Sequence, residues 1–191
     1  VNATQCRAWL SIRNDGEERI LSVIPFFHVY GMTTAMNFGI IIGAELILLP
    51  KFHTKEVLRV IHKKRPTIFP GIQAMYLAIG NYMKTHKYEL TSIKAAVSGA
   101  GPLMKEVQER FEQLTKARIV EGYGLSEASP VTHANPIFGR RKSGTIGLPW
   151  PDTEARIVDL ETGLRELPVG EAGELVIRGP QVMQGYWNKT E

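Results

Sequence analysis

Residues 95–127, AAVSGAGPLMKEVQERFEQLTKARIVEGYGLSE, are the stretch that decides the fold of this protein. Two short apolar runs, 95–97 and 119–120, predict strands, and the segment 105–115 between them predicts a helix. The apolar residues of that helix recur every three or four positions, at Val107, Phe111 and Leu114. A strand, a helix and a second strand in this order predict a parallel pair of strands.

The same alternation precedes this stretch. Short apolar runs and helical patterns take turns from about residue 21 onward, predicting strands at 21–24, 46–49 and 67–69 and helices at 33–42, 55–64 and 73–83. Strands that alternate with helices of this length indicate a mostly parallel sheet covered on both faces. We therefore expect an α/β fold.

The pattern changes near residue 143. Segments 153–159 and 173–178 alternate apolar and polar residues as strands do, and glycine and proline become frequent. We expect residues 1–142 to form part of an α/β subdomain and residues 143–191 to form part of a small antiparallel β-rich subdomain. The chain lacks an initiator methionine and ends without a terminal element, so we also expect it to be a piece of a longer protein.

The composition excludes several classes of protein. The chain has 191 residues, is 43% hydrophobic and carries a net charge of +4. Its basic residues are scattered, which argues against nucleic acid as a partner. The single cysteine, Cys6, excludes an internal disulfide, and the five histidines do not cluster as metal ligands would.

No segment of the sequence predicts export or a membrane span. The chain does not begin with a signal-peptide pattern. The longest uncharged stretch, 29–44, is shorter than the roughly 20 apolar residues that a spanning helix needs. We therefore expect a cytoplasmic location and leave peripheral membrane association and the oligomeric state open.

Two glycine-rich loops follow the strands quoted first, at 98–102 and 121–127. Ligands of open parallel sheets bind beyond the carboxyl ends of the strands, and glycines let a ligand approach the backbone closely. Tyr123 offers a flat face to a purine, Ser126 a hydroxyl to a phosphate, and Glu127 an oxygen ligand to Mg²⁺. The alternative is that both loops only reverse the chain and that Glu127 is a surface carboxylate.

The sequence contains no Gly-x-x-x-x-Gly-Lys-[Ser/Thr] motif, which argues against an ordinary phosphate-loop NTPase. Instead, EGYGLSE at 121–127 closely resembles the signature of the adenylate-forming superfamily, which includes acyl-CoA synthetases, firefly luciferase and peptide-synthetase adenylation domains. The usual threonine is replaced by Ser126, which keeps the hydroxyl. Three further stretches match the superfamily in order: PFFHVYG at 25–31, SGAGP at 98–102 and GELVIRGPQVMQGYW at 173–187.

Within the superfamily, the stretches 129–136 and 143–154 are most similar to long-chain fatty-acid–CoA ligases. The resemblance implies that the chain is a central piece of the large N-terminal domain of such an enzyme. It also implies that the whole protein uses ATP and Mg²⁺ to convert a fatty acid to an acyl-adenylate and then transfers the acyl group to coenzyme A.

The resemblance also implies a role for each site residue. Glu127 would hold Mg²⁺, Ser126 would contact phosphate, and His28 would lie beside the reacting carboxylate, making these three the catalytic residues. Three residues would line the acyl tunnel with His28: Tyr30, Gly31 and Met32. The nucleotide would be bound by Ser126 together with Ser98, Gly99, Ala100, Gly101, Pro102, Glu121, Gly122, Tyr123 and Gly124.

Alternatives remain at this stage. A lone histidine after an apolar run is more often a core residue than a site residue. The chain could also be a nucleotide-binding module without catalysis, a ligase for an aryl or other carboxylic acid, or an interaction domain. By the resemblance, a phosphate-binding loop would precede Val1, and a ribose-binding aspartate and a C-terminal domain with a lysine would follow Glu191. We therefore expect the chain alone to be inactive.

Overall fold

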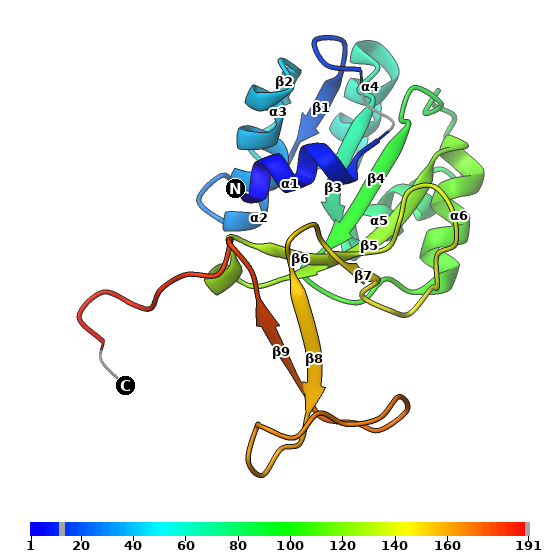
Figure 1. Cartoon of the computed structure of the whole chain (residues 1–191). Helices are drawn as coiled ribbons and strands as arrows, with labels where there is room; N and C mark the ends of the chain where they lie inside the picture. The colour runs from blue at the N-terminus through cyan, green and yellow to red at the C-terminus, as the bar shows by residue number, and fades with distance from the viewer. Residues whose placement is uncertain (12–13, 190–191) are drawn as a thin grey trace.

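In the computed structural model, which describes residues 1–11 and 14–189, a seven-stranded sheet carries helices on both faces (Figure 1). The strands lie in the order β2-β1-β3-β4-β5-β6-β7. Their bounds are β1 Arg19–Ser22, β2 Glu45–Leu48, β3 Ile68–Ile72, β4 Ala95–Gly99, β5 Arg118–Gly124, β6 Val131–Ala134 and β7 Leu148–Pro149.

Five neighbouring strands are parallel to one another: β2, β1, β3, β4 and β5. Strands β6 and β7 join the sheet antiparallel. The prediction of a mostly parallel sheet is therefore confirmed. The pair β4–β5, predicted from residues 95–127, is parallel, with Ser98 opposite Glu121 at the end of the pairing. The antiparallel strands β6 and β7 were not predicted.

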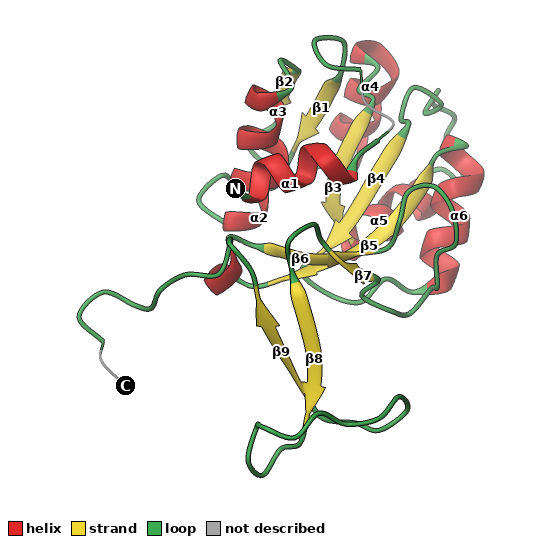
Figure 2. Ribbon diagram, viewed as in Figure 1, coloured by secondary structure: helices red, strands yellow, loops and turns green. Residues whose placement is uncertain are grey.

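The helices form two layers (Figure 2). Three of them match predicted segments closely: α4 Thr54–Lys64, α5 Gln73–Tyr82 and α6 Lys105–Thr115. The predicted helix 33–42 begins earlier, as a continuous helical segment made of α2 Val29–Gly31, the π-helical η1 Met32–Asn37 and α3 Phe38–Ile41. The first helix, α1 Asn2–Trp9, was not predicted.

Neighbouring residues along each strand point into different layers, because side chains of a strand alternate between its two faces. Leu21, Phe69, Ala96 and Ile119 pack in one core with α4, α5 and α6. The residues next to them in the chain pack in a second core with α1 and α3: Ile20, Ile68, Ala95 and Val120. The strands read as continuous apolar runs because both faces are buried.

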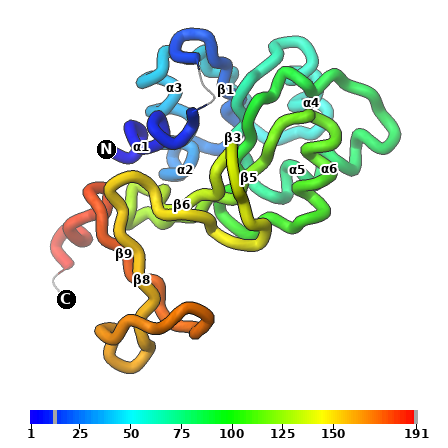
Figure 3. The backbone as a smooth tube through the Cα atoms, turned by 45° about the vertical axis from the view of Figure 1, so that its right-hand side comes forward, coloured from blue at the N-terminus to red at the C-terminus, as the bar shows by residue number. Residues whose placement is uncertain are grey.

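Beyond the main sheet, β8 Glu154–Val158 and β9 Glu174–Arg178 pair as an antiparallel hairpin. The hairpin projects from the body in Figure 1 and also in the turned view of Figure 3. The expectation of a small antiparallel part is confirmed. The division at residue 142 stays a prediction, and residues 190–191 of the second predicted unit lie outside the described residues.

Among the described residues, no helix combines the length and the hydrophobicity that crossing a bilayer requires.

Candidate functional site

The loops after β4 and β5 lie side by side, because these two strands are parallel neighbours and end at the same edge of the sheet. The amide of Leu103, just after the first loop, donates a hydrogen bond to Oε2 of Glu121 across 3.2 Å. Partial burial raises the pKa of the Glu121 carboxyl, and the Leu103 amide acts against that shift. Glu121 therefore ties the 98–102 loop to β5.

The backbone of the first loop takes an unusual path. Ala100 has φ of +59° and Gly101 has φ of +156°. A residue with a side chain disfavours the left-handed region by about 1–2 kcal/mol. Ala100 is exposed there, whereas Ser98, two residues earlier, is fully buried.

The second loop closes tightly on itself. The amide of Leu125 donates to the carbonyl of Pro130 across 3.0 Å. A Cβ atom on Gly124 would lie 2.0 Å from that same carbonyl oxygen, so only glycine fits. Tyr123, just before this closure, keeps 39% of its surface exposed, which leaves its ring accessible to a ligand.

Glu127 lies in η2, a short 3₁₀ turn over Ser126–Ala128. Oε1 of its carboxylate accepts a hydrogen bond from the hydroxyl of Tyr186. That bond holds the pKa of Glu127 below its ordinary value. The carboxylate is thus anionic at neutral pH, and it lies exposed to solvent near the exposed Ser126.

These residues fit a nucleotide-borne Mg²⁺ ion. The described residues contain no cluster of three His, Cys, Asp or Glu side chains that could hold a metal ion by themselves. Mg²⁺ is usually held by one or two carboxylates together with substrate phosphates and water, rather than by an all-protein cage. A single anionic Glu127 next to a hydroxyl matches that donor set.

His28 is exposed and precedes α2, so it is not the core histidine of the alternative interpretation. Its Nδ1 accepts a hydrogen bond from the amide of Tyr30 across 3.1 Å. In a neutral imidazole one ring nitrogen accepts and the other carries the proton. The neutral form of His28 therefore carries its proton on Nε2, which can donate to a carboxylate.

Tyr30 is buried, and its hydroxyl donates to the carbonyls of Val97 at 2.8 Å and Gly71 at 3.2 Å. Burial raises the pKa of Tyr30, so the hydroxyl stays protonated. Its ring packs against Gly99, where a Cβ atom would lie 2.9 Å from the Tyr30 ring. Tyr30 thus joins the His28 segment to the loop after β4.

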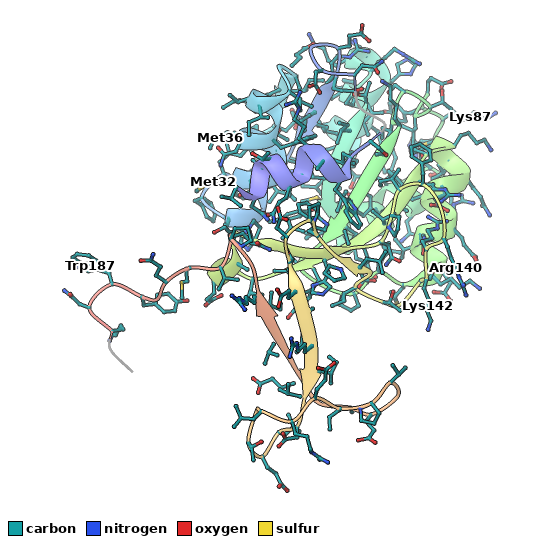
Figure 4. All side chains as sticks on the ribbon, in the orientation of Figure 1. Met32, Met36, Lys87, Arg140, Lys142 and Trp187 are labelled. Carbon is teal, nitrogen blue, oxygen red and sulfur yellow. The ribbon has the colours of Figure 1, made fainter. Side chains whose placement is uncertain are left out.

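Gly31 and Met32 take different places. A Cβ atom on Gly31 would lie 2.6 Å from the carbonyl of Pro25, so this glycine lets the helical segment start close to the preceding chain. Met32 is 37% exposed and lies on the outside of the molecule (Figure 4). Neither residue lines the cavity described next.

A cavity of about 220 Å³ connects these elements. It follows β5 from Val120 to Gly124 beneath α1, and its interior is lined mainly by apolar side chains. Eight of the predicted site residues line it: His28, Tyr30, Gly99, Ala100, Gly122, Tyr123, Gly124 and Ser126. Besides Gly31 and Met32, the predicted residues outside this lining are Ser98, Gly101, Pro102, Glu121 and Glu127.

The family of AMP-binding enzymes matches residues 1–187 of this chain. The chain belongs to the AMP-binding enzyme family. It is 50% identical over 190 residues to a long-chain-fatty-acid–CoA ligase of Bacillus subtilis, covering 100% of this chain and 34% of that protein. It is 36% identical over 177 residues to 4-coumarate–CoA ligase CCL1 of Humulus lupulus, covering 90% of this chain and 32% of that protein.

The fold agrees with this membership. ATP-bound MatB from Rhodopseudomonas palustris superposes with a TM-score of 0.86 at 26% identity, covering 98% of this chain and 36% of that chain. The chain thus spans about a third of the length of the curated relatives it matches.

One wall of the cavity in this member of the AMP-binding enzyme family was missed from the sequence. Helix α1 contributes Cys6 and Trp9, Leu10 follows directly after the helix, and Trp150 stacks on Trp9 with ring centroids 6.0 Å apart. Burial raises the pKa of the Cys6 thiol, so it stays neutral. The spacing of Cys6, Trp9 and Leu10 is helical and could have indicated an inward face.

The uncharged stretch 29–44 contributes only Val29, Tyr30 and Thr34 to the cavity lining. The rest of that stretch packs into the second core or faces outward: Phe38 and Ile42 are buried there, and Ile40 is 67% exposed. The apolar wall is therefore built mainly from α1 and the sheet.

Proposed function

We propose that the full-length protein is a long-chain fatty-acid–CoA ligase that activates its acid with ATP. The observation that carries this proposal is one cavity whose lining joins His28, Tyr123 and Ser126 to the apolar side chains of α1 and the sheet. The 50% identity to the Bacillus subtilis ligase supports the same substrate class.

The first step would join two anions, since a carboxylate oxygen attacks the α-phosphorus of ATP and pyrophosphate leaves. Such a step depends on positioning and on electrostatic stabilisation. Glu127 would hold Mg²⁺, which offsets the phosphate charge when bound, and Ser126 would donate to a phosphate oxygen. His28 would donate from Nε2 to the carboxylate and so orient it.

The nucleotide would lie across the paired loops. The ring of Tyr123 would stack on adenine, and the main chain from Gly99 to Gly101 would form one side of the slot. Glu121 would act through the loop that it ties down by its bond to Leu103. In the second step the thiolate of coenzyme A would attack the acyl carbon and displace AMP.

The apolar interior of the cavity favours an acyl chain. Each methylene moved from water into such a site contributes about 0.8 kcal/mol. The cavity, at about 220 Å³, is smaller than the roughly 300–1,000 Å³ of small-molecule sites. It therefore has room for part of an acyl-adenylate, and its apolar part suits the acyl end.

A substrate panel tests this function. The full-length protein would be given straight-chain acids of increasing length and aryl acids such as 4-coumarate, with release of AMP as the readout. We expect the highest kcat/KM with long-chain acids. A preference for aryl acids would instead favour the chemistry of the Humulus lupulus relative. Nucleotide binding without AMP release from any acid would favour a binding module.

Cys6 provides a sharper test of the acyl position. Its side chain is 2% exposed and lines the apolar part of the cavity. Cys6→Leu should fill that space and move the preferred acid to a shorter chain. Cys6→Ala is the matched control, because it leaves the space open and should keep the long-chain preference. An unchanged chain-length profile in Cys6→Leu would argue against this cavity as the acyl site.

A further inference from the structure

The segment that follows β9 returns to the site and binds Glu127 at two points. The amide of Met183 donates to the main-chain carbonyl of Glu127 across 2.8 Å, and the hydroxyl of Tyr186 donates to its carboxylate oxygen Oε1. The next residue, Trp187, is 91% exposed and lies on the outer part of this segment (Figure 4). Tyr186 is thus the residue by which this segment reaches the carboxylate.

A buried glutamine anchors the same segment. Gln181 is 3% exposed, and its amide nitrogen donates to Oγ1 of Thr153 across 2.7 Å. Its amide oxygen accepts from Gln5 of α1 across 3.2 Å. Gln5 also donates to the carbonyl of Pro151 at 2.6 Å. These bonds fix the segment against the helix that walls the cavity.

Two glycines shape the path from this anchor to Tyr186. A Cβ atom on Gly179 would lie 2.5 Å from the amide oxygen of Gln181, so a side chain there would disturb the anchor. Gly185, with φ of +145°, bends the chain directly before Tyr186. The segment that carries the Tyr186 hydroxyl is therefore attached at Gln181 and at Met183.

We propose that Tyr186 is a positioning residue that holds Oε1 of Glu127 and so presents the other carboxylate oxygen to a divalent cation bound to the nucleotide phosphates. This inference rests on the proposed function, in which Glu127 is the metal ligand. A glutamate side chain has several rotatable bonds, and the hydrogen bond from Tyr186 restricts them. Groups that hydrogen-bond to metal ligands orient those ligands, and losing one typically weakens metal affinity or activity about 10–100-fold.

If Tyr186 competed with the metal instead of positioning Glu127, its removal would change the metal affinity in the opposite direction. If the Tyr186 hydroxyl instead occupied the carboxylate oxygen that the metal needs, its removal would tighten metal binding. A measurement of metal affinity therefore separates positioning from competition. Activity alone would not separate them, because both roles change the rate.

The test compares Tyr186→Phe with wild type in the full-length protein. Binding of Mn²⁺ to the enzyme–ATP complex is followed by electron paramagnetic resonance without fatty acid, and activity is followed over a range of Mg²⁺ concentrations. We expect Mn²⁺ binding to weaken roughly tenfold, at the low end of the range for such partners. The lost activity should return at high Mg²⁺. Unchanged or tighter Mn²⁺ binding would overturn the proposal.

Two further variants complete the design. Tyr88→Phe is the matched control, because Tyr88 packs against His62 and against the core with α4, α5 and α6. This variant should bind Mn²⁺ as wild type does. Glu127→Gln tests the metal-ligand role of Glu127 separately from the positioning role of Tyr186. Wild-type Mn²⁺ binding in Glu127→Gln would overturn both the role of Glu127 and that of Tyr186. Weak binding in Glu127→Gln with normal binding in Tyr186→Phe would overturn only the role of Tyr186.

Discussion

Tyr123 and His133 face each other directly across the antiparallel pair β5–β6, and their rings meet edge to face with centroids 6.2 Å apart. His133 is 4% exposed, and its Nδ1 lies 2.9 Å from Oγ1 of Thr132. The ring proposed to stack on adenine is therefore supported from the sheet by a buried imidazole. Aromatic pairs of this geometry contribute about 0.5–1.5 kcal/mol beyond their burial.

The burial of His133 predicts a loss of stability in acid. Burial lowers the pKa of His133 in the folded protein below the ordinary histidine value of about 6.5. Between these two pKa values the unfolded chain binds more protons than the folded chain does. Stability therefore falls as the pH drops below about 6.5. His133→Gln should reduce this fall. Thermal melting of both full-length proteins at about pH 7.5 and about pH 5.5 measures it, and equal pH dependence would contradict the prediction.

The tight closure after β5 predicts that Gly124→Ala is strongly destabilising. The new methyl group would meet the main-chain carbonyl of Pro130, which cannot move without opening the loop. Overpacking of this kind destabilises by about 1–3 kcal/mol, and the closure beside Ser126 would be distorted as well. We expect a lower melting temperature and a clear loss of ATP affinity, measured by calorimetry.

Gly122→Ala is the matched control for that variant. A Cβ atom at this position would lie 3.2 Å from Cγ1 of Val97, a side-chain atom that can shift. We expect a smaller loss of stability than in Gly124→Ala. Equal losses in the two variants would show that the Pro130 contact is not the cause.

The buried hydroxyl of Tyr30 predicts a moderate loss of stability in Tyr30→Phe. The carbonyl of Val97 also accepts from Tyr76, whereas that of Gly71 would lose its Tyr30 donor. A lost hydrogen bond of this kind is worth about 1 kcal/mol. Chemical unfolding of the full-length variant should show a loss of that order, while Tyr82→Phe, at a partly buried ring that packs against the core with α4, α5 and α6, serves as control.

The short span of the chain predicts that residues 1–191 expressed alone catalyse no ATP–pyrophosphate exchange with any fatty acid. The chain covers about a third of the curated relatives, so about two thirds of their length has no counterpart in residues 1–191. Exchange assays with labelled pyrophosphate check this. Exchange above that of a Glu127→Ala version of the same chain would show that residues 1–191 suffice.

Much of the fold follows from local patterns. The runs and periodicities of residues 95–127 predicted β4, α6 and β5, because burial of both sheet faces leaves continuous apolar strands and amphipathic helices. Helix α1 was not predicted, although Cys6, Trp9 and Leu10 have helical spacing, and polar contacts help to dock it. The side chain of Asn2 bonds to both main-chain groups of Val131, 129 positions away. No periodicity reveals such a contact.

The candidate site divides in the same way. The chemical groups could be named in advance, since Tyr123, Ser126 and Glu127 follow a predicted strand and carry the functional groups that a nucleotide needs. The contact between Glu127 and Tyr186 could not be predicted, because it depends on the backbone path between β9 and Tyr186.

By itself, the amino-acid sequence determined which segments form the parallel sheet and which loops follow neighbouring strands, because these properties depend on local hydrophobic pattern and turn chemistry. Only the tertiary structure decided that α1 and Trp150 wall the cavity and that Tyr186 holds Glu127. Those contacts join residues far apart in the chain. Their geometry arises from how packed layers bring distant side chains within a few ångströms of one another.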